Sequence, residues 1–429
     1  MAKIKPFRAV IYNQEKIKDL SAVVCPPYDV ISPKDQQYYH ERSQYNLIHI
    51  LLGNDIEGED KYQRGADYFK EWLKNRILIR EEKPCVYFYS QEYNIKGEKR
   101  TRLGFISLLK LEEKGGFLVF GHENTELAPK EDRLRVLKRV RANLSPIFAI
   151  FLDKNRIIQR IYQNNVKGKE PLISLVDKEK TLHKIWRIDS PETLANIQSG
   201  IVTEVIFIAD GHHRYEVACA FRDKMKKKLA GAYTGSEDFN FVLTYFTNTN
   251  PRALLIMPVH RLVKLEERLD LEDFKVKLKD YFDIDEVKDK ARFFFLMERG
   301  GRTEHVIGMY WNRKYRLLRL KNIKVFDKVM SDKSKEYRSL DVSILNALVL
   351  KRILPENPEQ NRSIIFSPCA DDLIDKADSD FRYIAFFLNP VKFEQIIAVA
   401  LKGQKMPPKS TYFYPKVLSG LLINKFDNS

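Results

Sequence analysis

The chain has 429 residues, of which 44% are apolar and 12% aromatic, so it holds enough apolar surface for a folded protein of about two or three domains. Its apolar runs are of strand length and its N-terminus lacks an apolar signal region, which predicts a cytoplasmic protein with no membrane partner. The four cysteines include no CxxC pair and give little support to a zinc site or a disulfide framework.

The net charge of +16 admits nucleic acid as a partner. The 74 Lys and Arg residues are scattered along the chain, however. The densest run, residues 224–228, closes a predicted helix, where cations are favourable in any case. A basic surface that serves a small anionic molecule, or solubility alone, is therefore the favoured interpretation, and nucleic acid stays a second one.

Residues 1–116 are expected to form an N-terminal α/β segment that ends at Gly115-Gly116. Ser32-Pro33 has the pattern of a helix N-cap followed by proline at the first helical position. The prolines of Pro26-Pro27-Tyr28-Asp29 predict a stiff turn that holds Tyr28 against a core, and we interpret this turn as structural. The other expected elements are a strand over residues 7–12, a helix over 59–76, and a hairpin of strands 85–93 and 100–111 around Lys96-Gly97.

Residues 117–262 are expected to form the central core. Its polar stretch, residues 154–200, has the character of an insertion or subdomain. The expected elements are an amphipathic helix around residues 134–144 that Ser145-Pro146 ends, and strands over 147–152, 206–209, 239–246 and 254–263.

Residues 263–429 are expected to form a C-terminal α/β segment. Aromatic clusters such as Phe293-Phe294-Phe295 are assigned to a core. Residues 407–416 are unusual for a terminal stretch, because aromatic and hydroxyl side chains and two lysines lie between prolines. The expected elements are strands over 292–297, 305–311, 315–320 and 383–388, and helices over 341–353 and 393–402.

The most informative motif is the Asp210 turn, where an apolar strand runs into Asp210-Gly211-His212-His213-Arg214. Side chains that can carry positive charge oppose the dipole of a helix that begins there, unless an anion lies among them. A simple Asp N-cap with solvated neighbours is the alternative, and it explains only Asp210. The motif therefore predicts a phosphate site made by backbone N–H groups, His212, His213 and Arg214.

A second group of polar residues begins at His122-Glu123. Alone, this pair would be an ordinary turn histidine beside a surface glutamate. Thr125, Lys130 and Arg133 follow closely and offer a hydroxyl and two cations to a substrate or a phosphate. If this loop faces the Asp210 turn, Glu123 and Asp210 form a carboxylate pair that can orient a hydroxyl group and accept its proton.

A few further cations can belong either to a site or to the surface. His260-Arg261 stands at the end of a predicted strand, and both side chains can also cap carbonyl groups there. Lys409 and Lys416, in the aromatic C-terminal stretch, have the same standing. The sequence leaves both alternatives open for all four residues.

Six motifs together resemble a conserved bacterial and archaeal family catalogued as a domain of unknown function. Its central part is similar to the ParB and sulfiredoxin superfamily, and most closely to the archaeal free serine kinases, in which an HE pair, a helix, a Pro-Ile strand start and a DGHHR turn follow one another. The resemblance implies an α/β fold with a ParB/sulfiredoxin-like core and N- and C-terminal α/β extensions. The motifs are Cys25–Ile31, His122–Thr125, Asn143–Phe148, Ala209–Tyr215, Met257–Arg261 and Pro407–Lys416.

Carried over by residue, the resemblance implies that Gly211, His212, His213 and Arg214 hold nucleotide phosphates, and that Glu123 and Asp210 handle the acceptor hydroxyl and its proton. The long stretch 153–209 before the turn departs from the compact kinases and puts the adenine and acceptor pockets in doubt. A cysteine, which sulfiredoxin-type chemistry needs in the turn, is missing there.

The expected activity is that of a nucleotide-dependent phosphotransferase acting on a small hydroxylated metabolite. Free L-serine, giving O-phosphoserine, is the first choice of acceptor, with ATP or ADP as the donor and Mg²⁺ as the metal. A nucleotide-gated ParB-like DNA-binding protein or a nuclease is the alternative, although no helix-turn-helix is evident. The acceptor, the choice between ATP and ADP, and the oligomeric state stay open.

Overall fold

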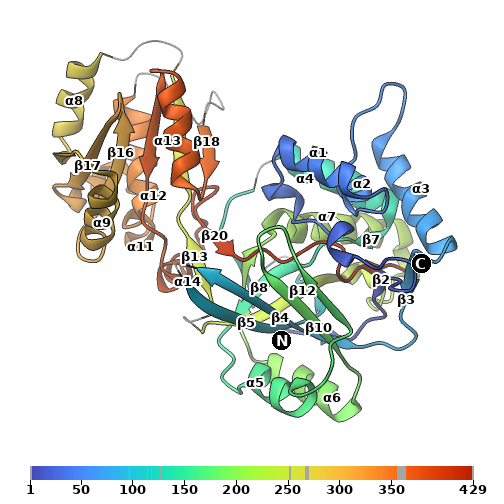
Figure 1. The fold of residues 1–429 in the computed structure, drawn as a ribbon. Coiled ribbons are helices and arrows are strands. Elements are labelled where there is room, and N and C mark those ends of the chain that lie inside the picture. Colours follow the sequence, from blue (N-terminus) through green and yellow to red (C-terminus); the bar gives the residue numbers. More distant parts are fainter. Residues whose placement is uncertain are drawn as a thin grey trace. The chain divides into compact units, whose positions relative to one another are not determined.

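The computed structural model describes residues 2–95, 97–113, 115–116, 118–125, 127–250, 253–265, 270–354 and 364–427. The chain divides into two compact units (Figure 1). Unit 1 comprises Met1–Gly121, Thr125–Leu255 and Pro415–Ser429, and unit 2 comprises His122–Asn124 and Ile256–Tyr414. Each unit is therefore built from segments that are far apart in the sequence.

Among its described residues, unit 1 holds a nine-stranded sheet in the order β6-β11-β8-β12-β5-β4-β10-β9, with β1 beside β5. The sheet is mixed, because β11 pairs with β6 and β12 with β8 in parallel while the other pairs are antiparallel. Its strands are β1 Ile4–Lys5, β4 Val86–Ile95, β5 Glu98–Lys110, β6 Val119–Gly121, β8 Ile147–Phe151, β9 Ile173–Val176, β10 Leu182–Ile188, β11 Ile206–Asp210 and β12 Phe241–Asn248.

Two short strand pairs complete the strands of unit 1. They are β2 Val10–Tyr12 with β3 Leu78–Arg80, and β7 Ala142–Asn143 with β21 Asn424–Lys425. The second pair ties the end of the chain to the segment that leads into the central strand β8. Every residue of β8 is buried, as expected for a strand covered on both sides.

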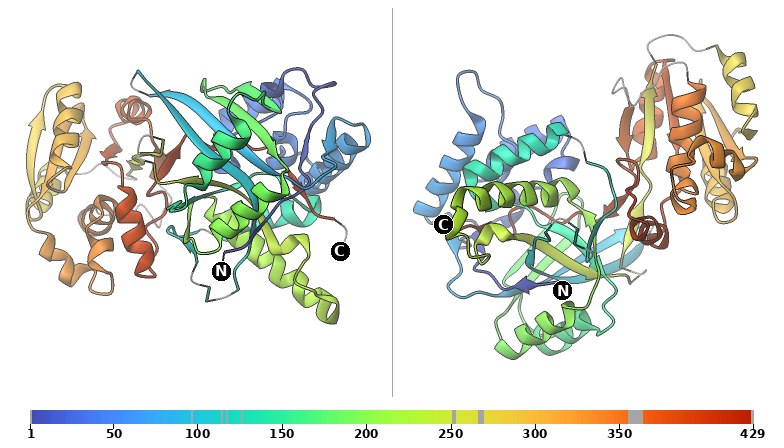
Figure 2. Two further views of the ribbon diagram at one scale, coloured as in Figure 1. Left: turned by 90° about the horizontal axis from the view of Figure 1, so that it is seen from below. Right: turned by 180° about the vertical axis from the view of Figure 1, so that it is seen from behind.

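Figures 1 and 2 show two groups of helices in unit 1, with α5 and α6 on one side and α1 to α4 and α7 on the other. In the second group, α4 and α7 pack through an apolar cluster that includes Leu137, Val217, Phe221 and Phe426. The helices are α1 Pro33–Arg42, α2 Ile48–Leu51, α3 Lys61–Lys74, α4 Leu127–Val140, α5 Ile157–Ile161, α6 Pro191–Ile201 and α7 His212–Leu229, and the shorter turns are η1 Leu20–Ala22, η2 Tyr28–Val30, η3 Tyr162–Val166, η4 Ala230–Ala232 and η5 Asp238–Asn240.

Unit 2 holds a six-stranded antiparallel sheet in the order β15-β17-β16-β19-β14-β18, counted over its described residues. β16 and β17 are joined by Asn312 and Arg313, both with positive φ, as a two-residue hairpin turn of type I′ requires. The strands are β14 His260–Lys264, β15 Phe282–Val287, β16 Val306–Trp311, β17 Lys314–Leu320, β18 Ile364–Ser367 and β19 Tyr383–Phe387, and the short β13 Leu255–Met257 and β20 Tyr412–Tyr414 lie outside this sheet.

Helices cover both faces of the unit 2 sheet. Phe293 of α9 and Leu373 of α13 share a core cluster with Val306 and Tyr310 of β16. Trp311 points to the opposite face, because side chains alternate along a strand, and its ring lies 5.9 Å from that of Phe274 in α8. The helices are α8 Leu271–Lys279, α9 Lys290–Gly300, α10 Phe326–Val329, α11 Lys335–Arg338, α12 Asp341–Ile344, α13 Ala370–Ser379 and α14 Phe393–Leu401, with η6 Ile323–Val325 and the π-helix η7 Leu345–Ile353.

The mixed α/β architecture confirms the predicted fold class, and most predicted elements are present with ends shifted by a few residues. The predicted hairpin is β4 and β5, although Lys96 of its turn lies outside the described residues. One element is wrong: residues 292–297, predicted as a strand, lie in helix α9. No helix in the described part of the chain is long and apolar enough to cross a membrane.

The structure divides the chain differently from the three predicted segments 1–116, 117–262 and 263–429. Residues 1–116 and most of 117–262 share one sheet, because β5 pairs with β12 and β4 with β10. The predicted insertion, residues 154–200, contributes β9 and β10 to that sheet. The end of the chain returns to unit 1 at Pro415, which puts the two lysines of the C-terminal stretch, Lys409 and Lys416, into different units.

Candidate functional site

The Asp210 turn has the strand-turn-helix geometry that its sequence predicts. β11 ends at Asp210, Gly211 adopts a left-handed conformation with φ 90° and ψ 30°, and α7 begins at His212. A Cβ atom at Gly211 would also lie 2.9 Å from Cζ of Arg214, so both the backbone angle and the close approach require glycine. The N-cap residue of this 18-residue helix is Gly211, which has no side chain to cap it.

Two cations converge on the carboxylate of Asp210. Lys416 Nζ lies 2.6 Å from Oδ1, and a guanidinium nitrogen of Arg214 lies 2.6 Å from Oδ2. Burial alone would raise the pKa of Asp210, but Lys416 and Arg214 outweigh it and hold that pKa well below the ordinary value. A carboxyl group held so firmly ionised is a weak proton acceptor. Two cations therefore contact a single carboxylate at this turn.

A network inside unit 1 fixes the position of Lys416. The carbonyl of Lys416 accepts a hydrogen bond of 2.9 Å from Gln91, and the carbonyl of Pro415 accepts one from Arg102. The Arg102 side chain is fully buried, donates to the amide oxygen of Gln91 and lies over the ring of Phe148 at 4.5 Å. Lys416 is therefore presented to Asp210 by a rigid set of strand residues.

Tyr28 and Asp29 also lie at this cluster. Charge interactions link the Tyr28 hydroxyl to Asp29, Arg214 and Asp210, and burial raises the pKa of Tyr28. The hydroxyl of Tyr28, Oδ1 of Asp29 and Nε of Arg214 are buried and have no hydrogen-bond partner among the described residues. Buried polar atoms normally have partners, so these three mark a place where a ligand or water completes the structure.

A small cavity of about 60 Å³ adjoins Tyr28 and Arg214, a volume of roughly two water molecules. Arg133 lines the same cavity, with its guanidinium 4.3 Å from the Tyr28 ring. The other contacts of Arg133 are with Asp132 and with the carbonyl of Leu51. In this structure Arg133 is thus held by internal contacts beside Tyr28, and its predicted contact with a substrate or phosphate stays a prediction.

Thr125 and Lys130, both proposed as substrate contacts, meet at Glu216 of α7 in unit 1. The Thr125 hydroxyl donates to Glu216 at 2.5 Å, and Lys130 Nζ lies 3.0 Å from that hydroxyl and 3.2 Å from the carboxylate. The side chains of Lys130 and Glu216 remain about one third exposed, at 27% and 31%. Thr125 and Lys130 thus form a polar cluster with Glu216, which lies in the first turns of α7.

Glu123 lies in unit 2, held by the C-terminal stretch that the sequence marked as unusual. Its Oε1 accepts hydrogen bonds from the backbone N–H groups of Ser410 and Thr411, at 3.0 and 3.1 Å, and from the Thr411 hydroxyl at 3.1 Å. Its Oε2 accepts no hydrogen bond from the part of the chain that the structure describes. Burial raises the pKa of Glu123, and Lys409 and the two backbone N–H groups only partly offset this effect.

The neighbours of Glu123 in unit 2 have structural contacts. The buried His122 has its Nε2 3.1 Å from the Thr411 hydroxyl. Burial lowers the pKa of His260 to about 4, and its Nδ1 accepts the N–H of Leu388. Arg261 is buried and donates to the carbonyls of Val259 and Lys409. His260 and Arg261 therefore support the chain around Lys409.

The predicted residues fall into two groups in different units. His122, Glu123, His260, Arg261 and Lys409 belong to unit 2, and Thr125, Lys130, Arg133 and the Asp210 turn belong to unit 1. The pairing of Glu123 with Asp210 stays a prediction. From the sequence, Lys416 could belong either to a site or to the surface, and Tyr28 was interpreted as structural. Arg102 was missed, because its only signal in the sequence was a charged residue inside a buried strand.

The described residues contain no group of three or more His, Cys, Asp or Glu side chains that could hold a metal ion. Both oxygens of Asp210 are taken by cations. Mg²⁺ is commonly held by one or two carboxylates together with the phosphates of a nucleotide.

The fold and the Asp210 turn define a mixed α/β protein with two cations on one carboxylate at the N-terminus of the partly buried helix α7. The family model described as "Protein of unknown function (DUF1015)" matches residues 4–343, and the chain belongs to this family. This confirms the family resemblance that the motifs gave. A search of curated proteins finds no match.

Solved structures with some similarity to this chain include three at low identity. They are a free serine kinase mutant in complex with ADP (10% identity, 69% of this chain and 84% of that chain, TM-score 0.35), SbnI with C-terminal truncation from Staphylococcus aureus (10%, 74% and 86%, 0.37), and a conserved hypothetical protein from Pyrococcus furiosus (11%, 70% and 89%, 0.33). TM-scores this low do not establish a shared fold, and we base no conclusion on them.

Proposed function

We propose that this protein is a nucleotide-dependent phosphotransferase that acts on a small hydroxylated metabolite, and that the Asp210 turn binds the nucleotide phosphates. The observation that carries the proposal is the convergence of Arg214 and Lys416 on one carboxylate at the N-terminus of α7. Helix N-termini attract anions, and Arg214 and Lys416 add two positive charges there. The partnerless Nε of Arg214 and hydroxyl of Tyr28 can complete their hydrogen bonding on a phosphate.

The two carboxylates have different roles in this proposal. Asp210 orients Arg214 and Lys416 and stays ionised. Glu123 accepts the proton of the acceptor hydroxyl, because its pKa is raised and its Oε2 has no partner among the described residues. The acceptor oxygen bonds to the terminal phosphorus, the bond from that phosphorus to the bridging oxygen breaks, and the shortened nucleotide leaves with the electron pair.

The motif order makes L-serine the first acceptor to test, with ATP and ADP as donors. The assay measures transfer of labelled phosphate to L-serine and to a panel of other amino acids and hydroxy acids in the presence of Mg²⁺. Transfer to a hydroxylated acceptor is the expected result. If neither nucleotide binds by calorimetry and no acceptor is labelled, the proposal is wrong.

Two variants assign the roles. Glu123→Gln should keep nucleotide affinity and lose about 100-fold or more in turnover, the scale of a lost general base. Glu131→Gln, which changes an exposed glutamate of α4, is the matched control and should keep turnover. Near-normal turnover of Glu123→Gln would make Glu123 a structural residue.

Arg214→Ala should weaken nucleotide binding by about 1.5 kcal/mol or more, the scale of a charge-assisted hydrogen bond. Arg139→Ala, at a side chain of α4 that is 53% exposed, is the control for loss of one positive charge. Equal nucleotide affinity in the Arg214 variant and the control would exclude the turn as the phosphate site. Circular dichroism confirms that each variant is folded before affinity is compared.

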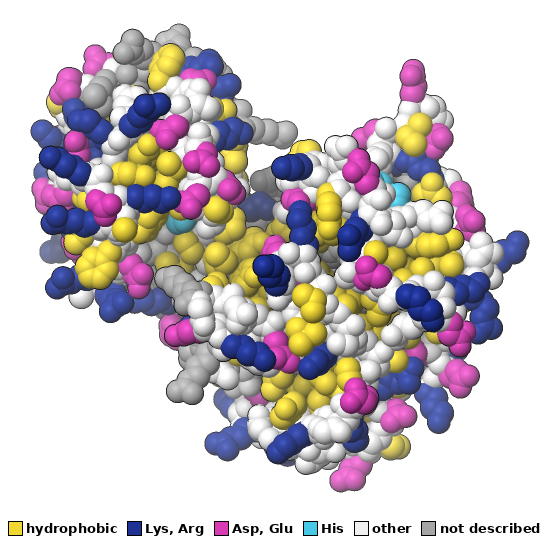
Figure 3. Space-filling model, viewed as in Figure 1, with side chains coloured by type: hydrophobic (Ala, Val, Ile, Leu, Met, Phe, Trp, Pro, Cys, Tyr) yellow, Lys and Arg dark blue, Asp and Glu magenta, His cyan; other side chains and the backbone are white. Residues whose placement is uncertain are grey.

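The DNA-binding alternative gains no support from the face of the molecule that Figure 3 shows. On the face that Figure 3 shows, Lys and Arg side chains alternate with Asp and Glu in both units and do not gather into one basic patch. A gel shift with duplex DNA at two salt concentrations is the test that would restore this alternative.

A further inference from the structure

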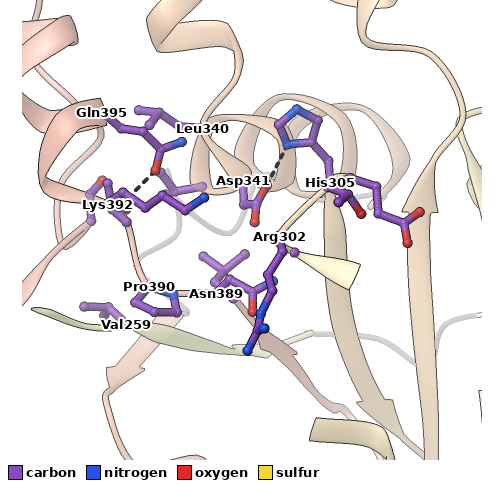
Figure 4. Close-up of a pocket in the computed structure, with 16 residues that line it drawn as sticks. Val259, Arg302, His305, Leu340, Asp341, Asn389, Pro390, Lys392 and Gln395 are labelled. Atoms are coloured by element: carbon purple, nitrogen blue, oxygen red, sulfur yellow. Dashed lines mark hydrogen bonds and ion pairs between the residues drawn. The ribbon is translucent and has the colours of Figure 1, made fainter. Parts of the chain in front are cut away.

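Unit 2 contains a pocket that none of the predicted site residues explains. It has a volume of about 210 Å³ and lies where β19 ends and α14 begins, beside the start of α12 and the end of α9 (Figure 4). Its polar lining includes Arg302, Glu304, His305, Asp341, Lys392 and Gln395, of which Glu304 is paired with Arg319, a residue outside the lining. Pockets that bind drug-sized ligands have volumes of roughly 300–1,000 Å³, so this smaller pocket suits a single small metabolite.

One wall of the pocket presents a carboxylate. Asp341 is the first residue of α12, and its Oδ1 lies 2.8 Å from Nδ1 of His305. Its Oδ2 has no hydrogen-bond or ion-pair partner among the described residues. The Asp341 side chain is 18% exposed, so a ligand can reach it. The histidine contact fixes the carboxylate and leaves one oxygen for a cationic group.

The facing wall presents a cation. Lys392 is the N-cap residue of α14, and Figure 4 shows its side chain reaching into the pocket toward Asp341. Its ammonium group has no partner in the described ranges of the chain. The backbone of Lys392 is held by its N–H bond of 2.9 Å to Gln395. The N-terminus of α14 adds a partial positive charge at the same wall.

The floor of the pocket is rigid and uncharged. The amide nitrogen of Asn389 donates to the carbonyls of Met297 and Val306, at 3.3 and 3.4 Å. Apolar lining residues, including Leu340 and Leu388, are buried. Asn389 and the apolar residues therefore give the pocket a fixed shape between its two charged walls.

A carboxylate and an ammonium group that face one pocket exclude the simplest ligands. A plain anion would be repelled by Asp341, and a plain cation by Lys392 and Arg302. A zwitterion satisfies both walls. We propose that this pocket binds a free α-amino acid, with its carboxylate at Lys392 and the N-terminus of α14 and its ammonium group at Asp341. This inference does not depend on phosphate transfer.

The test is calorimetry of the full chain, without nucleotide, against each of the twenty protein amino acids. At least one should bind with a dissociation constant of about 1 mM or tighter. Two analogues identify the charged groups: ethanolamine lacks the carboxylate and L-lactate lacks the ammonium. Each should bind about 10-fold or more weaker than the amino acid, because each leaves one charged wall unsatisfied.

Two variants locate the binding site. Lys392→Ala and Asp341→Asn should each weaken binding of the amino acid by about 10-fold or more. Lys392 is at an exposed position. Lys402→Ala, at the exposed far end of α14, is the matched control and should bind as the unchanged protein does.

Three results would each overturn the inference: no amino acid binds, an analogue binds as well as the amino acid, or folded Lys392→Ala keeps full affinity. Because no nucleotide is present, none of these results bears on the phosphotransferase proposal. Conversely, a protein that transfers no phosphate can still bind an amino acid in this pocket.

Discussion

The ion pairs of Asp210 lead to a prediction about stability that needs no ligand. Lys416 and Arg214 both contact the carboxylate of Asp210, and the three side chains are 10–15% exposed. Asp210→Asn removes the carboxylate that contacts both buried cations, which should cost about 3–5 kcal/mol of unfolding free energy. Lys416→Met leaves Asp210 paired with Arg214 and should cost about 1.5–3 kcal/mol.

The double variant separates the direct interaction from local damage. In the variant that combines Asp210→Asn with Lys416→Met, only Arg214 loses its contact with Asp210. The sum of the two single losses in unfolding free energy should therefore exceed the loss in the double variant by at least about 1.5 kcal/mol. Urea denaturation followed by fluorescence measures these values. A Trp311→Phe background restricts the signal to Trp72 and Trp186, which both lie in unit 1. Losses that add to within about 0.5 kcal/mol would refute the coupling.

The pH dependence of the same variants has a definite sign. A carboxyl group whose pKa is lowered on folding contributes stability above its ordinary pKa, and this contribution is lost as the pH falls through the folded value. The difference in stability between the unchanged protein and Asp210→Asn should therefore stay constant from neutral pH down to about pH 4 and shrink only below it. A difference that shrinks already above about pH 5 would contradict a lowered pKa.

Three further predictions concern single positions. Tyr28→Phe removes a buried hydroxyl without a described partner, so the unfolding free energy should stay unchanged or rise by up to about 1 kcal/mol, whereas a clear loss in urea denaturation would reveal a hidden partner. Arg313→Gly should raise the melting temperature and add up to about 1 kcal/mol, because Arg313 has φ 57° beside Asn312 in the β16–β17 hairpin, and a lower melting temperature would refute this. Gly104→Ala should destabilise by about 2 kcal/mol or more, because its Cβ would lie 2.2 Å from the carbonyl oxygen of Phe246, and near-native stability in the same assay would show that β5 and β12 can separate.

Helix α9 shows where local pattern reading fails. The run Phe293-Phe294-Phe295 has the aromatic composition of a strand. In the structure Phe293 and Met297, four residues apart, are 0% and 5% exposed, whereas Phe295 is 61% exposed, which is the burial period of a helix. Asp289 caps the helix by accepting the N–H of Arg292 at 2.7 Å. The N-cap aspartate was the signal in the sequence that could have corrected the prediction.

The candidate site could be predicted only where it is local. The Asp210 turn follows from a strand, a glycine and a helix that are contiguous in the chain. Its partner Lys416 lies 206 positions away, and the N–H groups that hold Glu123 lie 287 and 288 positions away. One sequence carries no signal for such distant contacts. The same holds for the pocket at Lys392, which combines residues from five parts of unit 2.

Glu123 and Asp210 show how partners, rather than burial, decide the role of a carboxyl group. Burial acts to raise the pKa of both. Asp210 has Lys416 and Arg214 in direct contact, and these full charges reverse the effect of burial. Glu123 has neutral N–H and hydroxyl donors on one oxygen, which only reduce the effect, and Lys409 acts on it without a direct ion pair. If one of the two groups accepts a proton near neutral pH, it is therefore Glu123, and turnover should rise with pH through its raised pKa. A profile that Glu123→Gln leaves unchanged in shape would assign that proton to another group.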